Sequence, residues 1–412
     1  MSSAWIGAGL ALLLLALTCL HWVPRLPRVA VSSAEIDADF THEQRDREER
    51  FHERIRPWGY LSLVISLLIP VVLTGSGAVA RIADSVPGGW APATAVATTF
   101  VLVSTWAVGL PAAVRSRLIL LDVGLATGSW GRWWRDAAVA ELLSLLLAVV
   151  AAVGVIGAAR LWPFRWWLPV AAAAVVLVVV LSFILPVVVE PMFSRFIPLA
   201  PGELRDELLQ MADRDGVHVR EVLVADASKR TSALNAYVSG FGPTRRIVVH
   251  DTLLDRDHDD EVVAVVAHEL GHVVARDVIY GTLVGAFGAA ALVFGLAILL
   301  DIPAVLVFGH ASGPADPAVV GILIIVAGWT SFIAAPVMNG ISRRIERQAD
   351  QHSFELTQDP AAMVRMHQAL AIHNVAALRP RVWRYVWFAS HPTSPERIKA
   401  ARMFAGQRLS GG

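Results

Sequence analysis

The amino-acid sequence predicts a mainly α, multi-span membrane protein that carries a small α+β domain. Hydrophobic residues make up 55% of the 412 residues and charged residues only 17%, a composition outside the range of soluble globular proteins. Seven separate segments are long and apolar enough to cross a bilayer as helices. Between the fifth and the sixth lie two short β-branched stretches, 219–225 and 246–249, which are typical of strands.

The predicted membrane helices cover approximately residues 4–23, 59–80, 90–114, 136–159, 167–189, 277–300 and 318–338. We expect the first to be a retained anchor, because no positive residue precedes it and no Ala-x-Ala-like cleavage site follows it. The connection at 24–57 is rich in charge and is predicted to be a cytoplasmic loop that is helical or partly mobile over 34–56. Cys19 is the only cysteine, so an intrachain disulfide is excluded.

Arginine is distributed unevenly among the connections between these segments. Seven arginines follow the first segment and four follow the third, whereas the connections on the other side hold only Arg81, Arg160 and Arg165. Positive residues favour the cytoplasmic side of a membrane. We therefore expect the N-terminus outside, and both 190–276 and 339–412 in the cytoplasm.

The motif that indicates chemistry is His268-Glu269-Leu270-Gly271-His272. Residues four apart on a helix share a face, so His268 and His272 can bind one zinc ion from the same side. Glu269 then lies beside the metal, where its carboxylate can take a proton from a bound water. Acidic residues at 259–261, followed by valines, favour a buried helix here. The alternative is that the two histidines only cap or pack, but buried imidazoles would then need other partners.

A second pair with the same spacing, Glu346 and Asp350, follows the seventh segment. Two histidines and one glutamate, with water as the fourth ligand, are a known catalytic zinc set, so Glu346 is the predicted third ligand. Asp350, one turn along, is expected to accept the second N–H of a ligand histidine. Taken alone, this pair would be read as ion-pair partners of the neighbouring arginines.

The topology brings these two motifs to the same membrane face. The first ends just before the sixth segment and the second begins just after the seventh, so all three ligands emerge on the cytoplasmic side. The chain is thus predicted to divide into a membrane part with five helices and the 24–57 loop (1–189), the first half of a zinc protease domain (190–276), membrane helices six and seven (277–338), and the second half of that domain (339–412).

The mixed unit contains a segment suited to substrate binding. Residues 235–243 have an extended pattern and end in Gly-Pro, as an edge strand does. An edge strand can hold a substrate backbone by strand addition. The alternative is a simple hairpin with no ligand.

Several stretches together resemble the type-I CaaX prenyl protease family, the integral-membrane zinc endopeptidases. Besides the two motifs, they are 190–199, 235–237, 251–254, and His391-Pro392 with 396–398. The resemblance covers most of the chain and implies that the seven helices form a barrel around a water-filled chamber, with the zinc site near its cytoplasmic end. It also implies that Asn235 and His391 are catalytic and stabilise the oxyanion. The alternative for His391 is that it only caps the last helix.

The predicted function is therefore that of a zinc-dependent metalloendopeptidase with one zinc ion per chain. Its expected partners are membrane lipids and a peptide or protein substrate, which is lipidated if the resemblance extends to the substrate. Zero net charge, without a basic run between aromatics, excludes nucleic acid. One alternative is a membrane quality-control zinc protease, although such proteins typically have fewer spans. Another is an inactive zinc-binding scaffold, which would not need Glu269.

The balance of lysine against arginine bears on where the protein resides. Only residues 229 and 399 are lysines, against many arginines and alanines. This bias is typical of a GC-rich, bacterial genome. The predicted location is therefore a bacterial plasma membrane.

Overall fold

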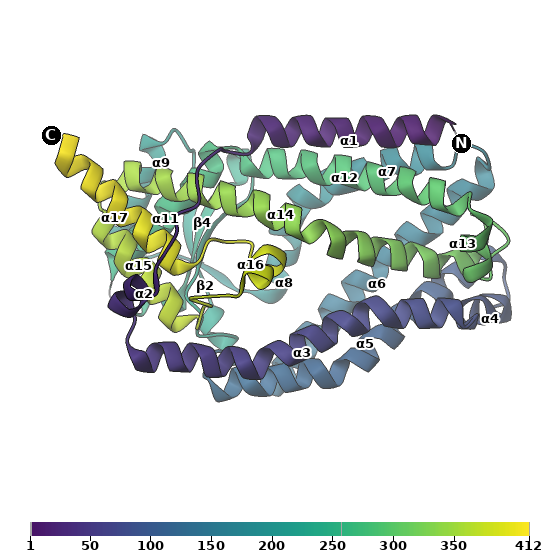
Figure 1. Ribbon diagram of the computed structural model, residues 1–412, viewed down its shortest axis with the longest axis horizontal. Helices are drawn as coiled ribbons and strands as arrows, with labels where there is room; N and C mark the ends of the chain where they lie inside the picture. The colour runs from purple at the N-terminus through teal and green to yellow at the C-terminus, as the bar shows by residue number, and fades with distance from the viewer. Residues whose placement is uncertain (1, 257, 412) are drawn as a thin grey trace.

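A bundle of long helices is joined at one end to a mixed α/β domain in the computed structural model, which describes residues 2–256 and 258–411 (Figure 1). Within these residues, seven helices are long and apolar enough to cross a membrane, which confirms the predicted number. The long helices are α1 (Ser2–Trp22), α3 (His42–Gly75), α5 (Trp90–Asp122), α6 (Trp130–Leu161), α7 (Trp167–Ile184), α12 (Asp277–Leu300) and α14 (Val320–Thr357).

The long helices pack along their lengths as neighbours. Helix α12 lies against both α1 and α7, and α5 lies against both α3 and α6. Short elements close the end of the bundle that is remote from the mixed domain (Figure 1). They are α4 (Ala78–Ser85), α13 (Pro303–Phe308) and the 3₁₀ turn at Pro317–Val319.

The charged connection at 24–57 is largely helical. It contains α2 (Ser33–Asp39) and the first four turns of α3. Thr41 caps α3 through a reciprocal pair of hydrogen bonds with Gln44. Oppositely charged groups four residues apart, such as Asp46 and Arg50 at 3.9 Å, then support the charged half of the helix. A helix is one of the two conformations that the sequence analysis left open for 34–56, and a capped stretch with such pairs favours it.

The mixed domain is built on a four-stranded sheet in the order β1-β2-β4-β3. Its strands are β1 (Phe196–Pro198), β2 (Glu221–Ala225), β3 (Ala236–Ser239) and β4 (Arg246–His250). Strands β2 and β4 run parallel, and the other two pairings are antiparallel. The segment predicted to be an edge strand is β3, and it does lie at an edge of this sheet.

Helices from two separate parts of the chain complete this domain. They are α8 (Glu190–Phe193), which follows a π-helical turn at Leu185–Val189, α9 (Glu203–Arg214), α10 (Asp251–Leu254), α11 (Asp259–Val274), α15 (Pro360–His373), α16 (Val382–Phe388) and α17 (Ser394–Gly411). The 3₁₀ turns at Ala227–Lys229 and Gly242–Thr244 connect the strands. Helix α14 runs from the bundle into the domain without a break, so one helix links the two parts.

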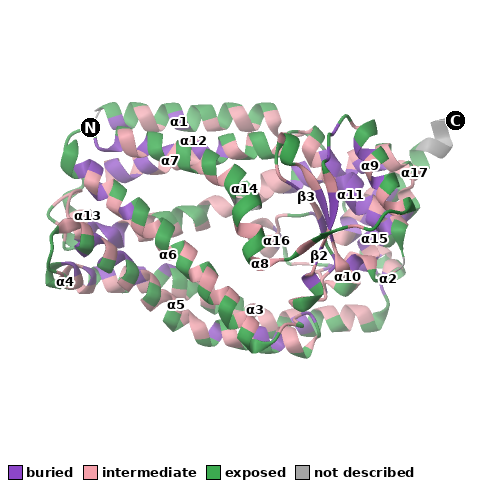
Figure 2. Cartoon of the chain, turned by 180° about the vertical axis from the view of Figure 1, so that it is seen from behind, coloured by how far each residue is buried: buried purple, intermediate pink, exposed green. Residues whose placement is uncertain are grey.

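Burial differs sharply between the two parts. Figure 2 shows buried residues concentrated in the strands and in α11, whereas the long helices are mostly exposed or intermediate. The largest buried cluster includes Leu208, Ile247, Leu270, Phe354 and Met363, from five elements of the mixed domain. Large apolar side chains on the long helices are instead exposed, as expected for surfaces that face lipid.

Candidate active site

Helix α11 presents two histidines on one face. Asp259, Asp260 and Glu261 lie in its first turn, where negative charge favours a helix start. One turn separates His268 from His272, and their Nε2 atoms lie 3.2 Å apart with the rings nearly perpendicular. His268 is buried and His272 is partly buried. The two imidazoles therefore converge on one point, as their spacing predicts.

Glu346 reaches the same point from α14. Its Oε2 lies 3.3 Å from His268 Nε2, and its Oε1 lies 3.5 Å from His272 Nε2. The two Nε2 atoms thus lie 3.2 Å apart, and each has a different oxygen of the Glu346 carboxylate within 3.5 Å. A tetrahedral zinc site with bonds of about 2.05 Å has ligand–ligand edges of about 3.3 Å. The residues therefore fit a zinc ion in spacing as well as in type.

The Glu346 carboxylate gives independent support for a cation. Its Oε2 is buried and has no hydrogen-bond partner among the described residues. A buried carboxylate oxygen without a partner is destabilising. If both imidazoles carry their proton on Nδ1, their Nε2 atoms and this oxygen are acceptors around one place, and a cation would satisfy all three.

Close packing of α11 against α14 depends on Gly271. A Cβ atom at this position would lie 3.0 Å from Ala349 Cα and 3.2 Å from the Ala349 carbonyl oxygen. Those are backbone atoms of α14, which cannot rotate away. Glycine at the fourth position of the motif therefore allows the histidines to approach Glu346.

The outward nitrogens of both histidines have carboxylate partners. His268 Nδ1 lies 3.0 Å from Asp350 Oδ1, one helical turn beyond Glu346. His272 Nδ1 lies 2.6 Å from Asp277 Oδ2 in the first turn of α12. A hydrogen bond from each Nδ1–H leaves the Nε2 lone pair free to bind a metal. Asp350 lies where the sequence analysis expected it, whereas Asp277 was missed.

Arg397, on α17, orients Asp350. Its Nε donates to Asp350 Oδ2 at 2.9 Å, and its Nη1 lies 3.8 Å from Glu346 Oε2. Its Nη2 also lies 3.1 Å from His268 Nδ1, but that nitrogen already donates to Asp350, so the guanidinium approaches it without a hydrogen bond. Burial opposes the Arg397 charge, yet the carboxylates of Asp350 and Glu346 outweigh it and raise the Arg397 pKa. The sequence analysis noted Arg397 only as part of the tail motif.

His391 lies beside this cluster and does not cap the last helix. Thr393 takes that role, because its Oγ1 accepts from the Glu396 backbone N–H at 3.4 Å. His391 Nε2 instead lies 3.3 Å from Glu346 Oε1, and its Nδ1 pairs with Ser390 Oγ at 2.8 Å. The His391 side chain is 60% exposed, and it faces a cavity of the protein. Desolvation there lowers the pKa of His391.

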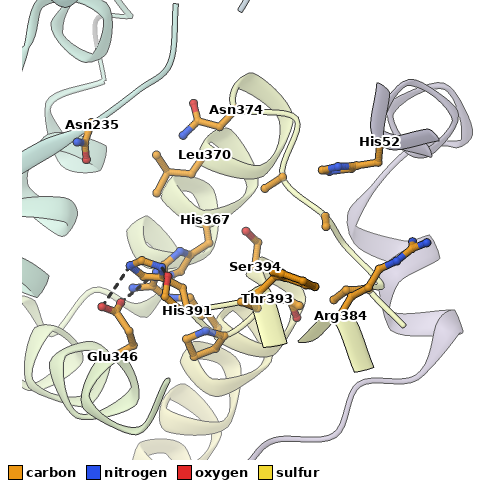
Figure 3. A pocket seen from close by; sticks show the side chains of 18 of the residues that line it. His52, Asn235, Glu346, His367, Leu370, Asn374, Arg384, His391, Thr393 and Ser394 are labelled. Carbon is orange, nitrogen blue, oxygen red and sulfur yellow. Dashed lines mark hydrogen bonds and ion pairs between the residues drawn. The ribbon is translucent and has the colours of Figure 1, made fainter. Parts of the chain in front are cut away.

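The cavity holds about 930 Å³ and connects the cluster with α3, α15 and α16. Glu269, Asn235 and His391 all line it. The ligating atoms of His268, Glu269 and His272 lie within 4.8 Å of one another, so Glu269 stands beside the proposed metal position. Asn235 lines another part of the wall, apart from Glu346 and His391 (Figure 3). Its catalytic role stays a prediction.

His367, on α15, is a cavity residue that the sequence did not suggest. It is buried, with its Nε2 3.9 Å from Asp350 Oδ1 and no hydrogen-bond partner among the described residues. Burial lowers the pKa of His367 well below its usual range. The ring is therefore neutral and adds no charge next to Arg397.

Comparison with known proteins assigns the family. A model of peptidase family M48 matches residues 198–405, about half of the chain, and this range includes all the residues of the cluster. The Bacillus subtilis protein "Uncharacterized metalloprotease YhfN" is 31% identical over 291 residues, which cover 69% of this chain and 67% of that protein. The "CAAX prenyl protease 1 homolog" of Oryza sativa is 31% identical over 287 residues, or 65% of this chain and 63% of that protein.

The fold extends over nearly the whole chain in a solved structure. The crystal structure of S. mikatae Ste24p superimposes with a TM-score of 0.76 at 19% sequence identity, and covers 97% of this chain and 99% of that one. This likeness confirms the predicted fold class, including the arrangement of the seven long helices. Together with the family match, it also confirms the resemblance to CaaX prenyl proteases. The chain therefore belongs to peptidase family M48 and is a multi-pass integral-membrane metalloprotease.

Proposed function

We propose that this protein is a zinc endopeptidase whose single zinc ion per chain is held by His268, His272 and Glu346. The observation that carries the proposal is the convergence of the two Nε2 atoms, 3.2 Å apart, on the Glu346 carboxylate, whose Oε2 and Oε1 lie 3.3 Å from His268 and 3.5 Å from His272. Asp350 and Asp277 hold the two imidazoles in the tautomer that zinc requires. Residues 190–276 and 339–412 supply these groups and form the catalytic domain, and 1–189 and 277–338 form the membrane part.

The side chains of this protein then have separate roles in peptide hydrolysis. Bound at this site, zinc would act as a Lewis acid toward the peptide carbonyl and lower the pKa of a water molecule. The Glu269 carboxylate accepts a proton from the attacking water and passes it to the leaving amine. The His391 Nδ1 contact with Ser390 favours a proton on Nε2, which faces the site. From there His391, together with the Asn235 amide, donates hydrogen bonds to the oxyanion.

Strand β3 is suited to hold the substrate in register with these groups. Among the described strands it pairs only with β4, at one edge of the sheet. Asn235 immediately precedes β3 and lines the cavity. A substrate added to this edge in extended form would pass Asn235 and Glu269 in turn.

The substrate class that fits best is the C-terminal region of a protein, lipidated in the manner of CaaX proteins. Relatives named CAAX prenyl protease support this assignment. A membrane quality-control protease would instead cleave unlipidated, misfolded proteins, and one experiment separates the two. Purified protein is given matched farnesylated and unfarnesylated peptides. We expect hydrolysis of the farnesylated peptide to be preferred, and equal hydrolysis of both would favour quality control.

Metal removal in the same assay tests the proposed zinc ion. Chelation should lower the rate about 100-fold or more, because a catalytic metal contributes several kcal/mol of transition-state stabilisation. One equivalent of zinc should restore the rate. Activity that survives chelation, with zinc absent by elemental analysis, would overturn the assignment.

We further propose that the N-terminus lies outside and that the catalytic domain faces the cytoplasm of a bacterial cell. The arginine-rich connections after the first and third membrane helices support this orientation. A fluorescent reporter fused to the C-terminus should be active, because it folds only in the cytoplasm. A periplasmic phosphatase fused at the same place should be inactive, and the reverse pair of results would invert the topology.

A further inference from the structure

Two arginines line the active-site cavity away from the metal ligands. Arg56 comes from the charged half of α3 and Arg384 from α16. His52 lies with them, but burial lowers its pKa to about 4, so it adds no charge. Figure 3 shows His52 and Arg384 on the opposite side of the pocket from Glu346 and His391. The charges of Arg56 and Arg384 are close enough to repel each other. The cavity therefore has a metal site at one side and a positive region at the other.

Arg384 has no counter-ion among the described residues. Within that part of the chain, its Nε is buried without a hydrogen-bond partner, and its guanidinium lies 5.3 Å from the ring of Trp383. Arg56 is partly neutralised, since Glu48 lies 4.0 Å away and Glu53 also attracts it. A partly buried guanidinium without a carboxylate partner is destabilising. Binding of an anion inside the cavity would relieve that penalty.

The chemistry of peptides identifies the anion. Every unmodified peptide carries one carboxylate at its C-terminus, whatever its sequence. A guanidinium binds a carboxylate through two parallel hydrogen bonds, which fix both position and orientation. Leu63, Leu370 and Phe388 line the same cavity and offer apolar surface for the side chains of the last residues.

We infer that Arg384, with Arg56 beside it, binds the C-terminal carboxylate of the substrate. This inference rests on the proposed peptidase function and extends it to how the cleavage position is chosen. With the carboxylate held at one side of a cavity of about 930 Å³ and Glu269 at the other, only a peptide bond near the C-terminus can reach the metal site. The distance from the substrate's C-terminus then determines which peptide bond is cleaved.

The test compares two peptides that differ only in their last group, a free acid and a C-terminal amide. We expect the wild-type protein to hydrolyse the acid with a kcat/KM about 10- to 100-fold higher, the range for a hydrogen bond to a charged group. Arg384→Gln should reduce the acid-to-amide ratio to about 1, mainly through KM. Arg381→Gln is the matched control, because Arg381 is exposed and does not line the cavity. It should keep the wild-type ratio.

Three results would overturn the inference. The first is equal hydrolysis of acid and amide by the wild-type protein. The second is an unchanged acid-to-amide ratio in Arg384→Gln. The third is an amide peptide that regains the full kcat/KM of the acid when an aspartate is added near its end. The third result would mean that Arg384 binds a side-chain carboxylate of the substrate and not its C-terminus. The wild-type comparison needs no variant, so it stands even if Arg384→Gln fails to fold. If the protein hydrolyses neither peptide, the proposed peptidase function is wrong. If it hydrolyses both equally, only the carboxylate site is wrong.

Discussion

Glu269→Gln is expected to reduce the rate of peptide hydrolysis by about 10²–10⁴-fold, the range over which a positioned general acid–base contributes. Glutamine has nearly the same shape as glutamate but cannot accept and return a proton. Zinc content should stay at one ion per chain, because Glu269 stands beside the three proposed ligands and is not one of them. Single-turnover kinetics and elemental analysis on the same purified sample measure the two quantities.

A matched substitution on the surface controls for this variant. Glu203→Gln, at an exposed position of α9, makes the same chemical change away from the cavity and should retain the wild-type rate. A fully active Glu269→Gln protein would remove Glu269 from catalysis. Loss of zinc in that variant would instead show that Glu269 is a ligand, and would require Glu346 to be reassigned.

His268→Ala is expected to abolish both stoichiometric zinc and measurable hydrolysis. This substitution removes one proposed ligand and leaves Glu346 and Asp350 as buried carboxylates without their imidazole partner. Asp350→Asn should be milder, since loss of an outer carboxylate typically weakens metal affinity by about 10- to 100-fold. Zinc titration of both variants gives the two affinities.

The control for the histidine variant lies on the same helix. His258 is exposed at the start of α11, remote from the cluster, and His258→Ala should bind zinc as the wild-type protein does. Stoichiometric zinc in His268→Ala would contradict the proposed ligand set. Loss of zinc in His258→Ala would mean that the effect arises from damage to α11.

The parts of the site that sequence reasoning found are those encoded by local spacing. His268 and His272 are one turn apart, as are Glu346 and Asp350, and helical periodicity alone puts each pair on a face. Counting membrane segments then brings the two helices to one side of the bilayer. The membrane helices were equally predictable from the sequence, because a run of about twenty apolar residues is typical of a membrane span.

What was missed depends on contacts between distant parts of the chain. Arg397 meets His268 across 129 positions of sequence, and nothing in an arginine of the final helix marks it as buried. Asp277 is only five residues from His272, but it follows the bend at Arg276, so helical spacing does not predict their contact.

Because α14 is continuous, the membrane influences the geometry of the catalytic site. Glu346 lies 18 residues beyond Gly328, which is near the middle of the apolar stretch, so about 27 Å of helix, with Pro336 inside it, separates them at 1.5 Å per residue. A change in helix tilt of about 5° would move Glu346 by about 2 Å, more than the 1 Å misplacement that can lower an enzyme's rate about 100-fold. His272 is tied through Asp277 to a different membrane helix, α12. Tilting is one way in which membrane helices accommodate a change in bilayer thickness, so lipid composition can alter how closely the two halves of the metal site meet.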